Sequence, residues 1–412
     1  MSKKLKFIEQ QTLSTFKKEI PSQYFSHLHG KKGFDDHLLK VEKLYRFGLV
    51  LPPEFFLGKK IVDLGAGTGE NTISLARWGA SLTLVEINSK ALEIAKSIFL
   101  KYSKNYSEHK FINSSLYDLN LKLLAGTFDI SHSRGVFTHV ENKFKAFKIL
   151  SSLTKPGGYI IYGDRNTLGG VQEMLQRYAI YYLIKKFNKK IIDTDTEIVN
   201  IAEKLFSEDT DRSQASVPRT RKAIIFDRWV IQQQDDPSVD DVLDFFEKEG
   251  LEYISSWPSI NFIGRGVSTY SDPRNLTALR TGARLVENLW MILNKGELEN
   301  ISSCNFLDNN QVFYKQLNIF SKLLRNIKIN NNISINRLLD SLKILNSIVK
   351  KNTASKLNKR LNIFFEEVKK FLKILEKEQD LKLIKHTIKD FQILFKGYSG
   401  VRHVDYVAYK PK

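Results

Sequence analysis

The sequence predicts an α/β protein with a doubly wound, mostly parallel sheet, a helical insertion and a C-terminal all-helical extension. Short apolar segments alternate with helical segments between residues 60 and 164, which is the pattern of a parallel sheet covered by helices on both faces. A glycine-rich segment, VDLGAGTGENT at residues 62–72, includes the end of the first apolar segment. Because ligands of such sheets bind beyond the carboxyl ends of the strands, this segment is the candidate ligand loop.

Five strands are expected in this part of the chain; the first is a short apolar run that ends in glycine, and the third segment includes the loop after its strand. They are KIVDLG (60–65), SLTLVEIN (81–88), HKFINSSLYD (109–118), FDISHSRGVFTHV (128–140) and GYIIYGD (158–164). The segments between them, ENTISLARWGA (70–80), SKALEIAKSIFLKYS (89–103) and ENKFKAFKILSSL (141–153), have helical spacing. Ser89 is the expected N-cap of the second helix.

The rest of the chain divides by changes in this rhythm. Residues 1–50 are expected to be N-terminal helices that form a lid and part of the substrate pocket, one of them starting near Asp35 and Asp36. A ligand-binding core is expected to follow at 51–166. Residues 167–222 are expected to form a helical insertion that caps the ligand edge.

The sheet is expected to end within residues 223–274. There the alternation resumes at AIIFDRWV (223–230) and a helix occupies 237–250. A strand pair is expected at 251–259 and 261–271. Residues 275–412 are expected to form a basic helical extension with one late strand at 403–411.

Composition limits the class of protein. The formal net charge is +19, and residues 301–412 hold 22 Lys and Arg against 9 Asp and Glu. Such basicity suits nucleic acid, an anionic membrane or an acidic sugar chain, and it equally suits solvated helix faces. One cysteine, Cys304, excludes an internal disulfide framework and favours a reducing compartment. With no apolar run near 20 residues and no secretory signal, we expect a cytoplasmic protein.

The chemistry of the glycine loop separates three ligands. A phosphate-binding loop needs Gly-Lys-Ser/Thr, whereas Gly69 is followed by Glu70 and Asn71, and the negative charge of Glu70 would repel a triphosphate. A dinucleotide loop needs G-x-G-x-x-G, and the third glycine here comes one residue early. S-adenosylmethionine has no phosphate and carries an ammonium and a sulfonium, so an acidic rim suits it. Glu86, at the end of the second strand, is placed to hold ribose hydroxyls.

Four motifs carry a resemblance to a known family: VDLGAGTGENT, LVEIN, FDISHSRGVFTHV and LTKPGGYIIYGD. In order and spacing they resemble those of class I S-adenosylmethionine-dependent methyltransferases, most closely the small-molecule, ubiquinone-biosynthesis-like branch. The resemblance covers residues 57–164 and, more loosely, 223–270. It implies a Rossmann-like methyltransferase fold with S-adenosyl-L-methionine as cofactor.

The resemblance also implies roles for residues at the cofactor site. The glycine loop would be formed by Asp63, Gly65, Ala66, Gly67 and Gly69. Glu86 would hold the ribose, Ile87, Ser115 and Leu116 would lie against the adenine, and Ser133, Arg134 and Gly135 would lie by the methionine part. The family usually places an acid against the adenine amino group, and this sequence has Ser115 at the aligned position.

Methyl transfer is an in-line displacement that depends on alignment and, for some acceptors, on removal of a proton. His139 and Asp164 are the candidate bases because both follow strands at the ligand edge; a histidine like His139 is often structural in the family. No metal site is expected, since the histidines are scattered.

The expected acceptor is a small or medium molecule such as a metabolite, a sugar or a quinone-like ring. Tyr178, Tyr181, Tyr182 and Trp229 either line its pocket or pack between helices, with Arg219 and Arg221 available for an anionic group.

The alternative function is an RNA-binding methyltransferase or a non-catalytic binding protein that uses the basic C-terminal helices. Nucleic acid is not favoured, because Phe364, Phe365 and Phe371 fall on the apolar stripe of their helix rather than among exposed basic residues. Peripheral contact with an anionic membrane and a homodimer formed through these helices both remain open.

Overall fold

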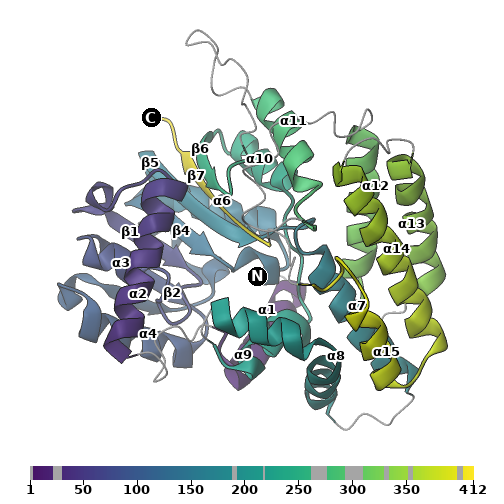
Figure 1. Ribbon diagram of the computed structural model, residues 1–412. Coiled ribbons are helices and arrows are strands. Elements are labelled where there is room, and N and C mark those ends of the chain that lie inside the picture. Colours follow the sequence, from purple (N-terminus) through teal and green to yellow (C-terminus); the bar gives the residue numbers. More distant parts are fainter. Residues whose placement is uncertain are drawn as a thin grey trace.

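The computed structural model describes residues 3–21, 30–187, 193–216, 219–260, 276–292, 310–328, 334–350, 356–396 and 402–412. At its centre is a seven-stranded sheet of order β3-β2-β1-β4-β5-β7-β6 (Figure 1). The strands are β1 (Lys60–Leu64), β2 (Ser81–Glu86), β3 (Lys110–Asn113), β4 (Phe128–Arg134), β5 (Thr154–Arg165), β6 (Glu252–Trp257) and β7 (His403–Tyr409). Neighbouring strands from β3 to β5 are parallel, and β7 is antiparallel to both β5 and β6. The expected fold class is confirmed.

Fifteen α-helices occur among the described residues, together with short 3-10 and π turns. The helices are α1 (Lys3–Lys18), α2 (Gly30–Lys43), α3 (Ile73–Arg77), α4 (Ser89–Tyr102), α5 (Leu121–Leu124), α6 (Lys143–Leu153), α7 (Val171–Lys186), α8 (Thr194–Ser216), α9 (Arg221–Ile225), α10 (Val239–Lys248), α11 (Leu276–Glu287), α12 (Asn310–Arg325), α13 (Ile335–Lys350), α14 (Lys356–Lys377) and α15 (Leu381–Lys389). None of the described helices is long and apolar enough to cross a membrane.

The helices cover the sheet on two sides because alternate strand residues point to opposite faces. On β1, Ile61 packs with α2, α3 and α4, whereas Val62 packs with α6, α10 and α11. Both faces are therefore buried, as a doubly wound sheet requires.

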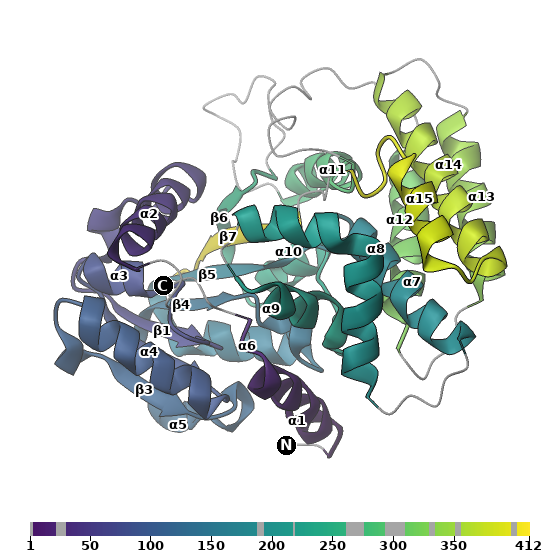
Figure 2. The same cartoon turned by 60° about the horizontal axis from the view of Figure 1, so that its bottom comes forward.

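A third apolar core lies beside the sheet, where α7 and α8 pack against the helices α12 to α15 (Figures 1 and 2). The apolar stripe of α14 faces this core, and Phe364, Phe365 and Phe371 are fully buried in it. The charged residues of α14 are left on its outer side. The aromatic residues of the basic extension thus act as packing residues.

The late strand expected at 403–411 is present as β7, and it lies inside the sheet, between β5 and β6. Its register places Asp405 opposite Gly163 of β5 and opposite Trp257 of β6. The chain therefore leaves the sheet after β6, builds α11 to α15, and returns to fill the position between two strands that were formed earlier in the sequence.

Three expectations about local structure need correction. The N-cap of α4 is Asn88, whose side chain accepts from the Lys90 amide, so the helix is capped one residue earlier than expected. Helix α2 begins at Gly30, before Asp35 and Asp36. Residues 223–230 are helical, in α9 and the π turn η6 (Phe226–Val230), and do not resume the strand alternation.

Of the three elements expected in residues 237–271, the helix and the first strand are present in the structure. The helix expected at 237–250 is α10, which begins with a capping box between Ser238 and Asp241. The strand expected at 251–259 is β6. The strand expected at 261–271 lies outside the described residues.

Candidate cofactor and methyl-transfer site

The glycine loop turns sharply after β1 because its three glycines all have positive φ: +71° at Gly65, +56° at Gly67 and +74° at Gly69. This conformation is strained for residues with a side chain. Space also excludes a side chain at two of these positions. A Cβ on Gly65 would lie 2.5 Å from a methyl carbon of Val136, and one on Gly69 would lie 2.8 Å from the Phe99 ring. The loop therefore brings bare backbone to the carboxyl edge of the sheet.

Glu86, at the end of β2, holds the glycine loop and the next helix together. One carboxylate oxygen accepts from the Gly67 amide at 2.8 Å and the other accepts from the Asn88 amide at 2.7 Å. Burial raises the pKa of Glu86, and the two amide hydrogen bonds oppose that rise. Each oxygen keeps a further lone pair, so the carboxylate can also accept from ribose hydroxyls.

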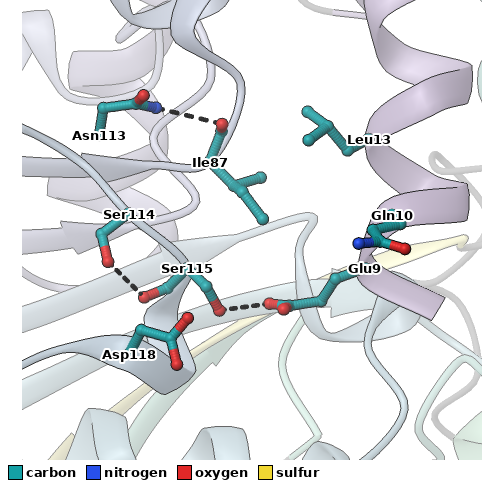
Figure 3. A pocket seen from close by; sticks show the side chains of 8 residues that line it. All are labelled: Glu9, Gln10, Leu13, Ile87, Asn113, Ser114, Ser115 and Asp118. Atoms are coloured by element: carbon teal, nitrogen blue, oxygen red, sulfur yellow. Dashed lines mark hydrogen bonds between the residues drawn. The ribbon is translucent and has the colours of Figure 1, made fainter. Parts of the chain in front are cut away.

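Two adjoining cavities open at this edge of the sheet. The loop cavity, about 170 Å³, is bounded by the glycine loop, the ends of β2 and β4, and α1. The outer cavity, about 450 Å³, lies between α1 and the ends of β2 and β3 (Figure 3). Most of the predicted cofactor-binding residues line the loop cavity: Gly65, Ala66, Gly67, Glu86, Ile87, Ser115, Leu116, Arg134 and Gly135. Their side chains and backbone come from four separate strand ends.

Asp63, Gly69 and Ser133 lie behind this lining and support it. Asp63 accepts from the Thr72 hydroxyl at 3.0 Å and pairs with the ring of His132, 2.8 Å away. Ser133 donates to the carbonyl of Leu64 at 3.0 Å, which ties β4 to β1. These residues fix the loop geometry and do not line either cavity.

The two candidate bases occupy different positions. His139, in the 3-10 turn η5 (Phe137–His139), lines the loop cavity. Asp164 is 2% exposed and accepts hydrogen bonds from the Thr138 amide and the Tyr162 hydroxyl, so its oxygens are used within the fold. Of the two, only His139 borders the space where a substrate can lie.

Arg134 projects from the end of β4 and is held by the returning strand β7. Its guanidinium makes two hydrogen bonds to the Asp405 carboxylate, at 2.6 and 2.9 Å. This pairing, with His403 beside it, holds the pKa of Asp405 far below its usual range despite burial. A Cβ on Gly163 would fall 2.0 Å from Asp405, so only glycine leaves room for the pair. Arg134 thus borders the cavity as a neutralised cation.

The part of the loop cavity next to His139 is largely apolar. Phe16, Ile20 and Pro21, from α1 and the residues after it, face Val136 and Val140 across this space. The ring of Phe16 meets His139 edge-on, with 5.3 Å between the centroids.

The aromatic residues considered for the acceptor pocket belong to the helical core, and Tyr182 packs against it while partly buried. Tyr178, Tyr181 and Trp229 are fully buried within it. Arg219 pairs with Asp227 at 3.1 Å, and Arg221 pairs with Glu203. Both arginines therefore already have carboxylate partners inside the fold.

Other residues of the site were not predicted from the sequence, among them Glu9 and Phe16 of α1, Asn88 and Asp405. Asn88 follows Glu86 in the LVEIN motif, so its proximity could have been inferred. Glu9 and Asp405 come from segments far away in sequence, and no local pattern marks them. Among the described residues, no group of three or more His, Cys, Asp or Glu side chains is arranged to hold a metal ion.

Comparison with known proteins gives a consistent result. Residues 57–217 match a family model described as a methyltransferase domain. The ubiquinone biosynthesis O-methyltransferase of Vibrio parahaemolyticus is 28% identical over 109 residues, which are 26% of this chain and 45% of that protein. The mitochondrial ubiquinone biosynthesis O-methyltransferase of Schizosaccharomyces pombe is 34% identical over 110 residues, 26% of this chain and 38% of that protein. The chain therefore spans less than half of the length of both relatives.

Among solved structures, magnesium protoporphyrin IX methyltransferase from Synechocystis, with bound S-adenosylmethionine, aligns at 13% identity. The alignment covers 62% of this chain and 90% of that one, with a TM-score of 0.37.

The fold, the loop geometry and the sequence matches define the class. The chain contains a class I S-adenosylmethionine-dependent methyltransferase domain, and S-adenosyl-L-methionine is its cofactor. The residues present fit that cofactor, because a loop with three glycines, a carboxylate for ribose and apolar residues beside it surround one space.

Proposed function

We propose that the protein transfers a methyl group from S-adenosylmethionine to a hydroxyl group on a small, ring-shaped and largely apolar acceptor, with His139 as general base. The observation that carries this proposal is the position of His139. It borders the loop cavity while its Nδ1 lies 2.9 Å from the backbone carbonyl of Gln233.

This hydrogen bond determines which nitrogen of His139 can act as a base. A carbonyl oxygen only accepts, so Nδ1 must carry the ring proton and Nε2 keeps its lone pair. Burial, and the nearby positive charge of Arg165, lower the pKa of His139 below its usual value of 6.5. The imidazole is therefore neutral at pH 7 and ready to take a proton.

The chain's own residues would orient the acceptor and exclude water, while the bound cofactor supplies the electrophilic methyl group. Phe16 and Val140 form apolar walls beside His139, suited to the faces of a ring. A hydroxyl directed at Nε2 could give up its proton as its oxygen approaches the methyl group in line.

The charge of the site supports a neutral acceptor rather than an anionic one. Arg134 is paired with Asp405, Arg219 with Asp227 and Arg221 with Glu203, so each of these arginines already has a carboxylate partner. The two relatives named above are O-methyltransferases of ubiquinone biosynthesis, which supports a ring hydroxyl as the nucleophile.

The RNA-binding alternative has less support. Phe364, Phe365 and Phe371 are fully buried, so these rings of the basic extension cannot stack on bases.

The single cysteine, Cys304, suits a reducing compartment and supports a cytoplasmic location.

The test combines cofactor binding with turnover. Calorimetric titration with S-adenosylhomocysteine should give saturable binding to the wild type, and a panel of catechol-type phenols should include a methylated product. His139→Asn keeps a donor for the Gln233 carbonyl and removes the basic nitrogen. We expect the variant to bind S-adenosylhomocysteine within a few-fold of the wild type and to lose about 10²- to 10⁴-fold in kcat, the usual contribution of a general base.

The control is His386→Asn on α15, whose side chain is 78% exposed, and it should change neither quantity. Full turnover by His139→Asn would exclude His139 as the base. Absence of S-adenosylhomocysteine binding to the wild type would overturn the proposed reaction itself.

A further inference from the structure

The outer cavity has one wall that does not belong to the sheet. Helix α1 lies across the carboxyl ends of β2 and β3, and Leu13 and Glu9 point from it toward Ile87 and Ser115 (Figure 3). Two hydrogen bonds anchor the helix beside the site: Asn88 donates to the Phe16 carbonyl at 3.2 Å, and Thr12 donates to the His139 carbonyl at 3.3 Å. The helix is therefore a defined part of the binding space.

Glu9 forms a hydrogen bond with Ser115. Ser115 stands at the position where the methyltransferases that this sequence resembles usually have an acid against the adenine amino group. The Ser115 hydroxyl donates to one oxygen of the Glu9 carboxylate. An ionised carboxylate has about four acceptor sites on its two oxygens, so this bond leaves acceptor capacity on Glu9. Glu9 lines both the outer cavity and the loop cavity.

The chemistry of adenine matches this arrangement. Adenine has two flat apolar faces and one exocyclic amino group, which donates hydrogen bonds at the edge of the ring. Ile87 and Leu13 present apolar side chains from opposite sides of the space in Figure 3, and the Glu9 carboxylate lies at its lower edge. A ring held between the two apolar side chains would direct its amino group to this polar edge.

We propose that Glu9 recognises the adenine amino group of the cofactor, with Leu13 covering the ring face opposite Ile87. The inference rests on the proposed use of S-adenosylmethionine. The carboxylate that accepts from the adenine amino group thus comes from the N-terminal helix, and the hydrogen bond from Ser115, after the end of β3, holds it in place. Helix α1 then determines the specificity of the cofactor site.

Asp118 is the other carboxylate in this region, and its position is less suitable. It is the last residue of the 3-10 turn η4 (Leu116–Asp118). Asp118 lines the outer cavity but not the loop cavity, whereas Glu9 lines both. Asp118 also acts on Glu9, because its negative charge adds to burial in raising the pKa of the Glu9 carboxyl. Substitution of each acid in turn separates the two assignments.

The experiment compares two cofactor products that differ at one position of the base. S-adenosylhomocysteine has the amino group, and S-inosylhomocysteine has a carbonyl oxygen in its place. Each is titrated calorimetrically into the full-length wild type, Glu9→Gln and Asp118→Asn. The wild type should prefer the adenosyl compound, because a carboxylate accepts from an amino group and repels a carbonyl oxygen.

Glu9→Gln should bind S-adenosylhomocysteine up to about 10-fold more weakly, because a neutral amide oxygen accepts a weaker hydrogen bond than a carboxylate does. It should bind S-inosylhomocysteine at least as well as the wild type does, because a glutamine amide can donate to the carbonyl. This change in preference also excludes misfolding as the cause. Asp118→Asn should keep the preference of the wild type.

The outcomes are distinct. An unchanged preference in Glu9→Gln overturns the assignment to Glu9, and a changed preference in Asp118→Asn alone transfers the role to Asp118. If the wild type binds neither compound, the use of S-adenosylmethionine fails as well. If it binds both equally, the cofactor assignment stands and recognition of the amino group fails.

Discussion

Replacement of Gly163 by alanine tests how the returning strand holds the active-site arginine. Gly163 lies on β5 directly opposite Asp405 of β7. A Cβ at this position would lie 2.0 Å from a carboxylate oxygen of Asp405 and 2.9 Å from Nε2 of His403. The substitution adds one methyl group, and the backbone of Gly163 does not have a positive φ that alanine would disfavour.

The structure gives the expected magnitude. Side-chain Cβ atoms essentially never approach another heavy atom within 3.0 Å, so the Asp405 carboxylate must move by about 1 Å. Such a movement breaks its 2.6 and 2.9 Å hydrogen bonds to Arg134. Overpacking costs about 1–3 kcal/mol and disruption of a buried charge pair about 3–5 kcal/mol. Because Arg134 is partly exposed and can be rehydrated, we expect a loss of about 3 kcal/mol in the free energy of unfolding.

Urea unfolding followed by circular dichroism measures this loss, and calorimetry with S-adenosylhomocysteine reports the effect on the cavity that Arg134 borders. The double variant Gly163→Ala/Asp405→Ala is the control, because it removes the carboxylate oxygen that lies closest to the new methyl group. If the clash is the cause, the double variant is no less stable than Asp405→Ala alone, which is a large departure from additivity. Unfolding of Gly163→Ala at the same urea concentration as the wild type would refute this account of the pair.

Two further predictions concern buried carboxylates. Glu86→Ala should weaken S-adenosylhomocysteine binding by about 10- to 100-fold, because the Gly67 and Asn88 amides lose their shared acceptor; calorimetry checks this, and unchanged affinity would remove Glu86 from the site. Glu287 is fully buried, and burial raises its pKa to about 7, so the folded protein binds one more proton than the unfolded chain between about pH 4.5 and 7. The free energy of unfolding of the wild type should therefore fall by about 3 kcal/mol between pH 5 and 8, and that of Glu287→Gln should not show this loss. Urea unfolding of both proteins at the two pH values measures the difference. An equal shift of the two unfolding curves would contradict the prediction.

The sheet and the glycine loop could be predicted because their signals are local. A strand such as β1 appears in the sequence as a short apolar run. A backbone with positive φ favours glycine, so the loop is marked in the sequence by Gly65, Gly67 and Gly69. The position of Glu86 follows from the parallel sheet, since the end of β2 lies beside the end of β1. These features need no knowledge of distant segments.

Residues 223–230 show where local signals fail. Ala223, Ile224, Ile225 and Phe226 form a continuous apolar run, which suits a buried strand as well as a buried helix. The structure buries these residues in a helical segment. Periodicity cannot separate the two when every side of the segment is covered.

The N-terminal helices were expected to help form the substrate pocket, but the particular residues that α1 contributes could not be predicted. Glu9 meets Ser115 through tertiary packing alone, and a lone glutamate in an N-terminal helix has no distinguishing pattern. The departure at Ser115 was nevertheless a signal. The bond between Ser115 and Glu9 fits our proposal that α1 supplies the acid at this position.

The placement of β7 makes the helices of residues 276–389 a module inserted into a β-hairpin. Both ends of this module are fastened to neighbouring strands, since β6 ends at Trp257 and β7 pairs Asp405 with that same residue. Closure of this hairpin needs a loop that spans the whole module, and such non-local pairing forms slowly. The carboxylate that anchors Arg134 therefore reaches the sheet on a strand whose neighbours lie far away in the sequence.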